Sequence, residues 1–350
     1  MRKEQESTLI CRLERELCRS ITSGVYPSGT KLPGSTKLAA EFGVARGTVD
    51  AAIEQLVQRR YLERRSRSGT YVLDRKMRIL FLWTHAQVVL TPTNLNENMA
   101  INQLLLHGLY VESALQRAEV TCEYVLGTAA QEWPESRFRR VAEDFDGVVE
   151  RGGDEDTLKT LRKHGVPCVA CAHKYLSVPG FPSVAADPDD AFRALVVRIG
   201  EKGYRRVIIL AADVESFNPG RSNLLKINRF CEFAKEHGIG TVERVFSKTL
   251  DCGLFKRLTS TDAVFCSFTD WIPVIYAYCR QEKLVIGRHF GLFGYGSGVT
   301  FSNLHPEVVH GQIDFCEMGR QLCRSICELI VTGSAQNVLI PSHIKEGKSL

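Results

Sequence analysis

Apolar residues recur at helical spacing along the N-terminal part of the chain. In residues 8–22 four of them stand four apart, on one side of a predicted helix: Leu9, Leu13, Leu17 and Ile21. Two shorter apolar stripes follow, within residues 36–42 and 44–57, and Gly43 divides them. The pattern predicts a helix-turn-helix in which Ser35 or Thr36 caps the exposed N–H groups of the first helix.

Two extended segments and a short connector follow this motif. Tyr61-Leu62 and Gly69-Thr70-Tyr71-Val72 flank a basic, polar stretch, which predicts two short strands around an exposed tip, the arrangement called a wing. The connector Asp74-Arg75-Lys76 contains neither Pro nor Gly. We therefore expect a brief hinge rather than a long flexible tether between the wing and the rest of the chain.

From Met77 onward, apolar runs of strand length alternate with helical patterns. The predicted strands are residues 77–83, 120–125, 146–149, 166–170, 207–210, 263–266 and 290–294. The predicted helices are residues 98–118, 154–164, 188–202, 222–237, 270–282 and 306–331. Such alternation favours an α/β fold, a parallel sheet with helices on both faces. The remaining length suffices for two lobes of this kind.

The length and composition are those of a large globular protein. With 350 residues and 44% hydrophobic content, the chain has room for two or three compact units. No apolar run reaches the length of about 18 residues that indicates a membrane span. The first residues, MRKEQEST, lack the apolar stretch of a signal peptide. We therefore expect a cytoplasmic protein with no membrane partner.

The basic residues are unevenly distributed. Residues 1–76 hold 15 Lys and Arg against 9 Asp and Glu, whereas the remainder holds 30 against 31. The whole excess of positive charge thus lies in the small N-terminal unit. Attraction to phosphates requires such a local excess, so this unit is the candidate for binding double-stranded DNA.

Three segments of the N-terminal unit carry a more specific signal. ITSGVYPSGTKLP, LAAEFGVAR and GTYV occur in this order, and from about Ser7 to Val72 the chain resembles the winged-helix domain of GntR-type bacterial transcription regulators. The resemblance implies that the second helix of the motif reads the major groove, while the wing reaches the minor groove or the backbone. The DNA-facing candidates carried over by position are Thr36, Arg46, Gly47, Thr48, Arg65, Arg67 and Gly69.

Two positions depart from the family pattern. Thr36 and Asp50 stand where such regulators usually have Arg. A carboxylate is unfavourable near phosphates but can accept a hydrogen bond from cytosine N4, so the operator sequence is expected to differ. For Arg46 the competing interpretation is a solvated charge at a helix start. For the wing arginines it is an ordinary charged hairpin.

Longer segments downstream resemble a second family. DPDDAFRALVVRIGEKGYRRVIIL, NLLKINRFCEFAKEHGI and AVFCSFTDWIPVIYAYCRQEKLVIGRHFGLFGYGS are similar to the effector domains of LacI/GalR-type repressors, over roughly residues 77–345. The resemblance implies the fold of periplasmic sugar-binding proteins, in which two lobes crossed by three chain passages clamp a ligand. A GntR-type unit joined to this clamp is the architecture of arabinose-repressor-type regulators.

The ligand of an open α/β sheet sits beyond the carboxyl ends of the strands. This rule nominates Trp83, Thr84, His85, Glu150, Arg151, His173, Lys174, Asp213, Asp270, Trp271, Gly296 and Ser297. Trp83 and Trp271 offer aromatic faces to the apolar side of a sugar. The resemblance adds Lys226, which replaces an effector-contacting Arg. The ligand set is thus Trp83, His85, Glu150, Arg151, His173, Lys226, Asp270 and Trp271.

The resemblance also indicates what this clamp lacks. Besides Lys226 in place of Arg, Thr269 and Gly296 replace an Asn and an Asp of the family. Losing a bidentate Arg and an Asp removes two of the partners that bind sugar hydroxyl groups. The ligand is therefore expected to differ from a common hexose, or the response to ligand to be weak.

The twelve cysteines are scattered through the predicted elements. Cys168 and Cys171 have the spacing of redox and metal sites, and Cys316, Cys323 and Cys327 share the last helix. We interpret them as reduced, mostly buried thiols and expect no metal site and no cofactor. The motifs G-x-S-x-G, GxxxxGK[ST] and HExxH are absent, so we expect no enzymatic activity.

These observations predict a homodimeric transcription regulator, a repressor. It has a winged helix-turn-helix domain in residues 1–73, a hinge in residues 74–76 and a two-lobed effector-binding and dimerisation domain in residues 77–350. A sugar or sugar derivative closes the cleft and changes the spacing of two N-terminal domains on a pseudo-palindromic operator. Two alternatives stay open: a ligand-independent DNA-binding regulator whose clamp serves only dimerisation, and an enzyme with a DNA-binding appendage.

Overall fold

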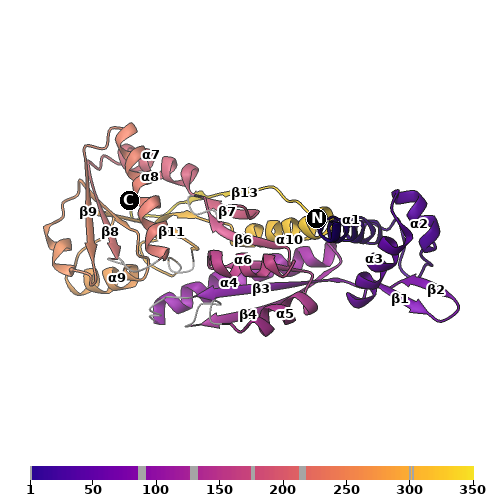
Figure 1. Cartoon of the computed structure of the whole chain (residues 1–350). Coiled ribbons are helices and arrows are strands. Elements are labelled where there is room, and N and C mark those ends of the chain that lie inside the picture. Colours follow the sequence, from indigo (N-terminus) through magenta and orange to yellow (C-terminus); the bar gives the residue numbers. More distant parts are fainter. Residues whose placement is uncertain are drawn as a thin grey trace.

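Three units lie in a row along the molecule: a small N-terminal domain, a first α/β lobe in the middle and a second α/β lobe at the far end (Figure 1). The computed structural model describes residues 2–85, 92–126, 133–174, 178–212, 218–298, 301 and 303–350, with side chains undescribed at 2–8, 85, 92–98, 126, 212 and 218–223. Within these ranges, no helix combines the length and the apolar character needed to cross a bilayer.

The N-terminal domain consists of three helices and a two-stranded wing. Its elements are α1 (Arg2–Thr22), α2 (Ser35–Phe42), α3 (Arg46–Gln58), β1 (Leu62–Arg65) and β2 (Gly69–Val72). The wing strands pair antiparallel. Buried apolar residues of the three helices form one core, which includes Leu13, Leu17, Leu38, Val49 and Leu56. The predicted helix-turn-helix and wing are therefore confirmed, although Leu9 in the predicted stripe is 44% exposed.

The predicted side-chain cap of α2 is wrong. Gly34 occupies the N-cap position, and no side chain caps the helix there. Ser35 lies one residue inside the helix, where its hydroxyl group donates a hydrogen bond to Asp50 Oδ1 of α3 at 2.6 Å. The serine thus links the two helices of the motif instead of ending one of them.

The first lobe contains a six-stranded sheet in the order β13-β7-β6-β5-β3-β4, with every pair parallel. Its strands are β3 (Met77–His85), β4 (Ala118–Leu126), β5 (Gly147–Arg151), β6 (Cys168–His173), β7 (Ser183–Asp187) and β13 (Val338–Pro341). Its helices are α4 (Pro92–Leu115), α5 (Glu135–Asp144), α6 (Glu155–Lys163) and α10 (Phe315–Thr332). Successive side chains of β3 point to opposite faces of the sheet. On one face they pack against α4 and α10, and on the other face against α5 and α6.

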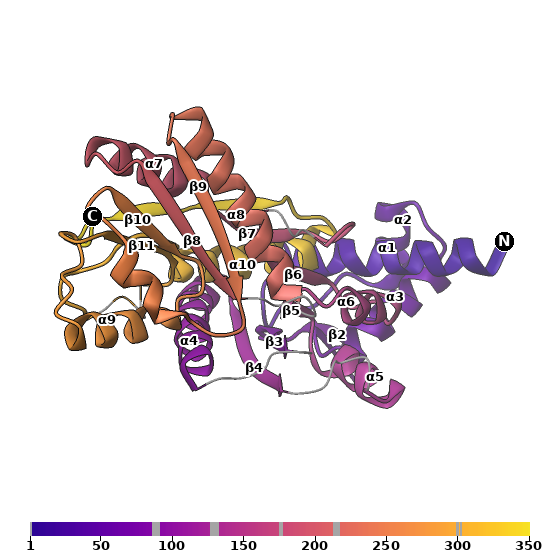
Figure 2. The same ribbon diagram turned by 90° about the vertical axis from the view of Figure 1, so that its left-hand side faces the viewer.

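The second lobe contains a sheet in the order β14-β12-β11-β10-β8-β9, parallel except for β14. Its strands are β8 (Arg206–Ala212), β9 (Thr241–Ser247), β10 (Asp262–Cys266), β11 (Gly291–Gly296), β12 (Val309–Gln312) and β14 (His343–Lys345). Helices α7 (Asp189–Glu201) and α8 (Asn218–Glu236) cover one face, whereas α9 (Trp271–Gln281) and the 3-10 helix η2 (Cys252–Arg257) cover the other (Figure 2).

The chain passes between the lobes three times, at β7 to α7, at β12 to α10 and at β13 to β14. The predicted α/β fold with two lobes and three crossings is confirmed. The predicted helix over 306–331 is wrong in its first part, because residues 309–312 pair with β11 as a strand. Asp314 then begins α10 by accepting a hydrogen bond from the N–H group of Glu317 at 2.8 Å.

Several elements escaped prediction, among them α5, β7 and β9. β9 is an edge strand with several exposed residues, so its sequence TVERVFS does not form the apolar run of a central strand. α5 is short and mostly charged and buries only two residues, Phe138 and Val141, so it contains no long apolar stripe.

Two glycines allow α4 and α10 to pack with their backbones in close approach. A methyl group at Gly108 of α4 would lie 2.0 Å from the carbonyl oxygen of Cys316 in α10. One at Gly319 of α10 would lie 2.1 Å from the carbonyl oxygen of Leu105 in α4. Since α10 also packs against α1, it connects the interior of the first lobe with the N-terminal domain.

Candidate DNA-binding surface and interlobe site

A groove of about 520 Å³ separates α2 and α3 from the wing. Polar and basic side chains form most of its wall, which consists of Ser35, Asp50, Ile53, Arg64, Arg65, Ser66, Arg67, Gly69 and Thr70. Arg64, whose guanidinium lies 3.3 Å from Glu54 of α3, was not singled out from the sequence, and Ser35 was singled out only as a helix cap. The basic character of the stretch 64–67 was the only signal for Arg64.

The predicted DNA-facing residues of the helix-turn-helix divide into exposed and buried ones. Thr36, Arg46 and Gly47 are exposed at the starts of α2 and α3. Thr48 is only 8% exposed, because it lies on the side of α3 that faces the domain core. Its prediction as a DNA contact is therefore corrected, since it has little surface to offer a ligand.

Asp50 holds the start of α3 in place through two partners. It accepts the hydrogen bond from Ser35, and its Oδ2 lies 3.6 Å from Nε of Arg46, one turn earlier in the helix. A surface pair of this kind contributes little to stability. Its effect is geometric, because it restricts the directions in which the Arg46 guanidinium points.

The wing presents its arginines at an exposed tip. Arg65 pairs with Glu63 at 3.0 Å, and its guanidinium lies 4.3 Å from the centre of the Tyr71 ring. Arg67 adopts a φ of 57° and Gly69 a φ of 118°. A side chain at Gly69 would also meet Lys31, whose Cε would lie 2.5 Å from the added Cβ. The tip therefore depends on Gly69 for its backbone conformation, whereas the flexible Lys31 side chain can move aside.

The aromatic group at the carboxyl end of β3 differs from the expectation. Trp83 is 2% exposed, and its ring packs edge-on against Tyr124 of β4 with 5.4 Å between ring centres. Trp83 consequently has little free face for a sugar, and its predicted stacking role is corrected. Tyr124, which is 40% exposed, is the better aromatic surface and was not among the residues nominated from the sequence.

Glu150 is completely buried at the end of β5. It accepts hydrogen bonds from the Thr84 hydroxyl group and from the N–H group of Gly153. Burial raises the pKa of Glu150 to about 7 despite the Thr84 hydrogen bond, which lowers it, and Asp154 raises it further. Glu150 therefore supports the structure beneath the site rather than reaching a ligand directly.

Arg151 and Asn102 form a polar pair beside Trp83. The Arg151 guanidinium donates a hydrogen bond to Asn102 Oδ1 and lies 5.2 Å from the centre of the Trp83 ring. Asn102 of α4 is fully buried, and its Nδ2 group has no hydrogen-bond partner among the described residues. Sequence reasoning missed Asn102 because it lies within a helix and not at a strand end.

His173 ends β6 of the first lobe, and Lys226 lies on α8 of the second lobe. Burial lowers the pKa of His173 to about 3, and the cations Lys226 and Arg151 lower it further. His173 is therefore neutral at physiological pH, with one ring nitrogen that donates and one that accepts. The Lys226 ammonium lies 5.7 Å from the centre of the Tyr295 ring. The structure thus brings three predicted residues into one interlobe junction.

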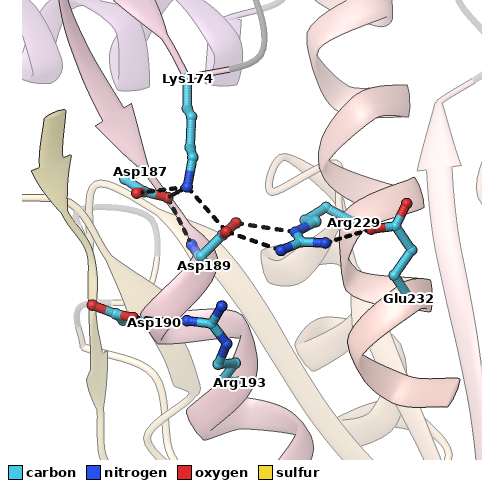
Figure 3. A network of polar contacts seen from close by, with 7 residues as sticks. All are labelled: Lys174, Asp187, Asp189, Asp190, Arg193, Arg229 and Glu232. Atoms are coloured by element: carbon cyan, nitrogen blue, oxygen red, sulfur yellow. Dashed lines mark hydrogen bonds and ion pairs between the residues drawn. The ribbon is translucent and has the colours of Figure 1, made fainter. Parts of the chain in front are cut away.

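An ion-pair network ties the two lobes beside this junction (Figure 3). Lys174 Nζ of the first lobe lies 2.8 Å from Asp187 Oδ2 and 3.0 Å from Asp189 Oδ2. Asp189 begins α7, and its Oδ2 also accepts from Arg229 Nη2 of α8 at 3.2 Å. Lys174 of the first lobe therefore binds carboxylates on both sides of the first crossing, at the end of β7 and at the start of α7.

Four further predicted residues follow the carboxyl ends of β10 and β11 in the second lobe: Asp270, Trp271, Gly296 and Ser297. Asp270 occupies the N-cap position of α9, but its side chain does not cap the helix. The ring of Trp271 packs edge-on against that of Phe268, with 5.2 Å between ring centres. Ser297 is buried and Gly296 is half-buried. Asp213 and the side chain of His85 lie outside the described residues.

The cysteines are all free thiols. Burial raises the pKa of Cys171 to about 12 and raises that of Cys168 still further, which makes both thiols poor nucleophiles at neutral pH. In the described part of the chain, no group of three or more His, Cys, Asp or Glu residues is arranged to hold a metal ion.

Comparisons with known proteins agree with this geometry. Residues 9–72 match the model of the bacterial regulatory proteins of the gntR family. The HTH-type transcriptional regulator TreR of Escherichia coli strain K12 is 24% identical over 261 residues, which cover 74% of this chain and 79% of TreR. TauR of Rhodobacter capsulatus is 42% identical over 67 residues, which cover 19% of this chain and 14% of TauR.

Solved structures share the fold over most of the chain. The transcriptional regulator CelR in complex with cellobiose has a TM-score of 0.61 at 18% identity and covers 91% of this chain and 100% of its own. A probable maltose operon repressor MalR from Staphylococcus aureus has a TM-score of 0.62 at 12% identity, with coverage of 79% and 98%.

The fold and these comparisons together define a DNA-binding transcription regulator. Its N-terminal domain is of the GntR type, and its two lobes have the fold of LacI-family regulators. The two-family resemblance read from the sequence is therefore confirmed.

Proposed function

We propose that this protein is a homodimeric repressor that acts on DNA in the cytoplasm and is controlled by a small polar ligand, a sugar or sugar derivative. The observation that carries the proposal is the interlobe junction. Arg151 and His173 end strands of the first lobe, and Lys226 lies on α8 of the second lobe. The ion pairs of Asp189 with Lys174 and Arg229 join the two lobes beside them. A polar ligand bound there contacts both lobes at once. Its binding therefore favours one relative orientation of the lobes.

The relatives support this class of ligand. The CelR structure is described as a complex with cellobiose, and MalR as a maltose operon repressor. Both proteins share the two-lobed fold with this chain. Exposed Tyr124, close to Arg151 and Trp83, supplies an aromatic face beside hydrogen-bonding groups, the combination that carbohydrate recognition requires.

The control of DNA binding follows from the order of the units. The N-terminal domain, residues 1–73, is joined through residues 74–76 to the two-lobed domain, residues 77–350. In a dimer, two N-terminal domains meet two half-sites of a pseudo-palindromic operator about one helical turn apart. A ligand that reorients the lobes changes the separation of these domains and thereby the operator affinity.

A ligand-independent regulator is the alternative. It is favoured by Lys226, Thr269 and Gly296, which stand where LacI-type effector domains have an Arg, an Asn and an Asp. The lobes then serve dimerisation alone.

A ligand screen distinguishes the ligand-controlled repressor from the ligand-independent regulator. Calorimetry against a panel of monosaccharides, disaccharides and their phosphates is expected to give at least one ligand. That ligand should change the affinity for a DNA duplex selected by the protein from a random library. Binding of none of these compounds, with operator binding intact, would favour the ligand-independent regulator.

Arg46→Ala is expected to weaken binding to the selected duplex by about 1–2 kcal/mol, because Arg46 is exposed at the start of the helix that enters the major groove. Fluorescence anisotropy at fixed salt concentration measures the change. Arg12→Ala is the matched control, since Arg12 of α1 is a similarly exposed arginine outside the groove. Equal affinities of the Arg46 variant and wild type would remove Arg46 from the DNA-reading set.

A further inference from the structure

A buried carboxylate lies where the N-terminal domain meets the first lobe. Asp146 precedes β5 and is 2% exposed. Its Oδ2 accepts a hydrogen bond from the backbone N–H group of Arg78 at 2.8 Å, and its Oδ1 accepts one from Arg59 Nη2 at 3.2 Å. Nη2 of Arg75 forms an ion pair with Oδ2 at 2.8 Å. These four residues form what we call the Asp146 contact.

The partners of Asp146 come from both the N-terminal domain and the connector that joins it to the first lobe. Arg59 is the C-cap residue of α3, the helix that begins with Arg46, and it also pairs with Glu14 of α1 at 2.5 Å. Arg75 belongs to the connector, yet its side chain is only 10% exposed. Arg75, the middle residue of the expected hinge 74–76, therefore holds this segment against the first lobe.

An aromatic ring completes the contact. Tyr61 is 2% exposed, and the guanidinium groups of Arg75 and Arg59 lie 4.3 Å and 5.4 Å from its ring centre. Cations over an aromatic face are attracted by its quadrupole. Two partly buried cations, Arg59 and Arg75, and two carboxylates, Asp146 and Glu14, thus balance in charge. Since an ion pair of this kind adds little net stability, we infer that its effect here is to restrict orientation.

A single strand connects the Asp146 contact to the interlobe junction. β5 starts directly after Asp146 and ends with Glu150 and Arg151, so about 16 Å of extended backbone separates the two ends. β5 lies between β3 and β6 in the middle of the sheet and is nearly completely buried. The strand therefore moves with the first lobe as a rigid body.

We propose that Asp146 is a positioning residue for DNA recognition. It fixes the N-terminal domain on the first lobe, so that the domain follows each movement of that lobe instead of swinging on a tether. α1, which packs against α10, provides a second point of support. The separation of two N-terminal domains in a dimer is then set by the lobes and not by the DNA.

Three variants test the positioning role in the full-length chain. Asp146→Asn keeps an oxygen for the Arg78 N–H group but removes the charge that binds Arg59 and Arg75. Arg75→Gln breaks the contact from the connector side and leaves the first lobe untouched. Asp74→Asn is the matched control, because Asp74 lies on the same connector but is 75% exposed and pairs with Arg117 on the surface.

Small-angle X-ray scattering provides the first measurement, which requires neither DNA nor effector. Asp146→Asn and Arg75→Gln are expected to increase the radius of gyration and to lose the fit to one rigid structure. Asp74→Asn is expected to match the wild type. Unchanged scattering of both contact variants, with circular dichroism showing that they are folded, would overturn the proposal.

The second measurement is the dependence of DNA affinity on half-site spacing, which a purely structural role of Asp146 would not change. The probes are the duplex selected by the wild type and the same duplex with five base pairs inserted between its half-sites. The insertion is expected to weaken wild-type and Asp74→Asn binding about tenfold or more, but the contact variants less than about threefold.

Affinity for a single half-site should be equal in all four proteins, because the DNA-reading residues are unchanged. A contact variant that keeps the wild-type dependence on spacing would overturn the positioning role. If the wild-type chain selected no DNA, the proposed function would fail, whereas the scattering comparison would still decide whether Asp146 holds the N-terminal domain.

Discussion

Gly108→Ala is expected to lower the free energy of unfolding by about 3 kcal/mol or more, at the upper end of what overpacking costs. The added methyl group would lie 2.0 Å from the carbonyl oxygen of Cys316 and 3.0 Å from the backbone nitrogen of Arg320. Both neighbours are main-chain atoms of α10, so no side-chain rotation relieves the clash. The two helices have to separate, and the core between them loses its packing.

Chemical denaturation of the full-length chain measures this loss. Gly200→Ala is the matched control, because Gly200 lies in helix α7 and an added methyl group there has no neighbour within 4 Å. The control is expected to be neutral or more stable by up to about 1 kcal/mol, since alanine favours a helix more than glycine does. Equal stability of the two variants would show that α4 and α10 are not in backbone contact.

Glu150→Gln is expected to stabilise the protein at pH 8 by about 2–3 kcal/mol and to have little effect at pH 5. Burial raises the pKa of Glu150 from an ordinary value of 4.5 to about 7. Between these values the folded chain keeps a proton that the unfolded chain has released, so wild-type stability falls as the pH rises through this window. Glutamine resembles the protonated acid at every pH and removes this dependence.

The measurement is denaturation of both proteins from pH 5 to pH 8. Glu119→Gln on the neighbouring edge strand β4 serves as the control, because Glu119 is exposed and its replacement should give a difference that does not change with pH. A constant difference between Glu150→Gln and wild type would contradict the raised pKa. If the difference grows with pH, Glu150 makes the floor of the interlobe junction sensitive to proton concentration near neutrality.

The candidate DNA-binding surface combines a common scaffold with unusual contacts. Asp50 accepts from Ser35 and lies near Arg46, so it orients its neighbours in addition to any direct reading of a base. An arginine at this position would repel Arg46 instead. The operator of this protein is therefore expected to differ from those of GntR-type regulators that carry arginine there, even though the backbone of the motif is the same.

Most of the fold was predictable because its signals are local. The stripes of α3 and α10 and the apolar runs of β3, β8 and β10 each lie within one stretch of chain, and each predicted the right element. Predictions failed where the local signal was weak or misleading. β12 was assigned to a helix because its four residues precede a strongly periodic segment, and the strand is defined by its pairing with β11.

The candidate site was less predictable than the fold. The strand-end rule found Arg151 and His173, which do lie at the interlobe junction. It also selected Trp83, whose ring is covered by Tyr124, and it omitted Asn102, which reaches Arg151 from within α4. A position along a strand predicts which edge a side chain approaches, but not whether another side chain covers it.

The sequence by itself determined the class of each unit and their order, because periodicity and short motifs depend on residues close together in the chain. Only the tertiary structure decided which side chains face solvent and how the units are joined. Thr48 turns inward, and Arg75 is held by a carboxylate rather than free in a hinge. Arg59 and Asp146 stand 87 positions apart, and contacts over such separations arise only when the whole chain has folded.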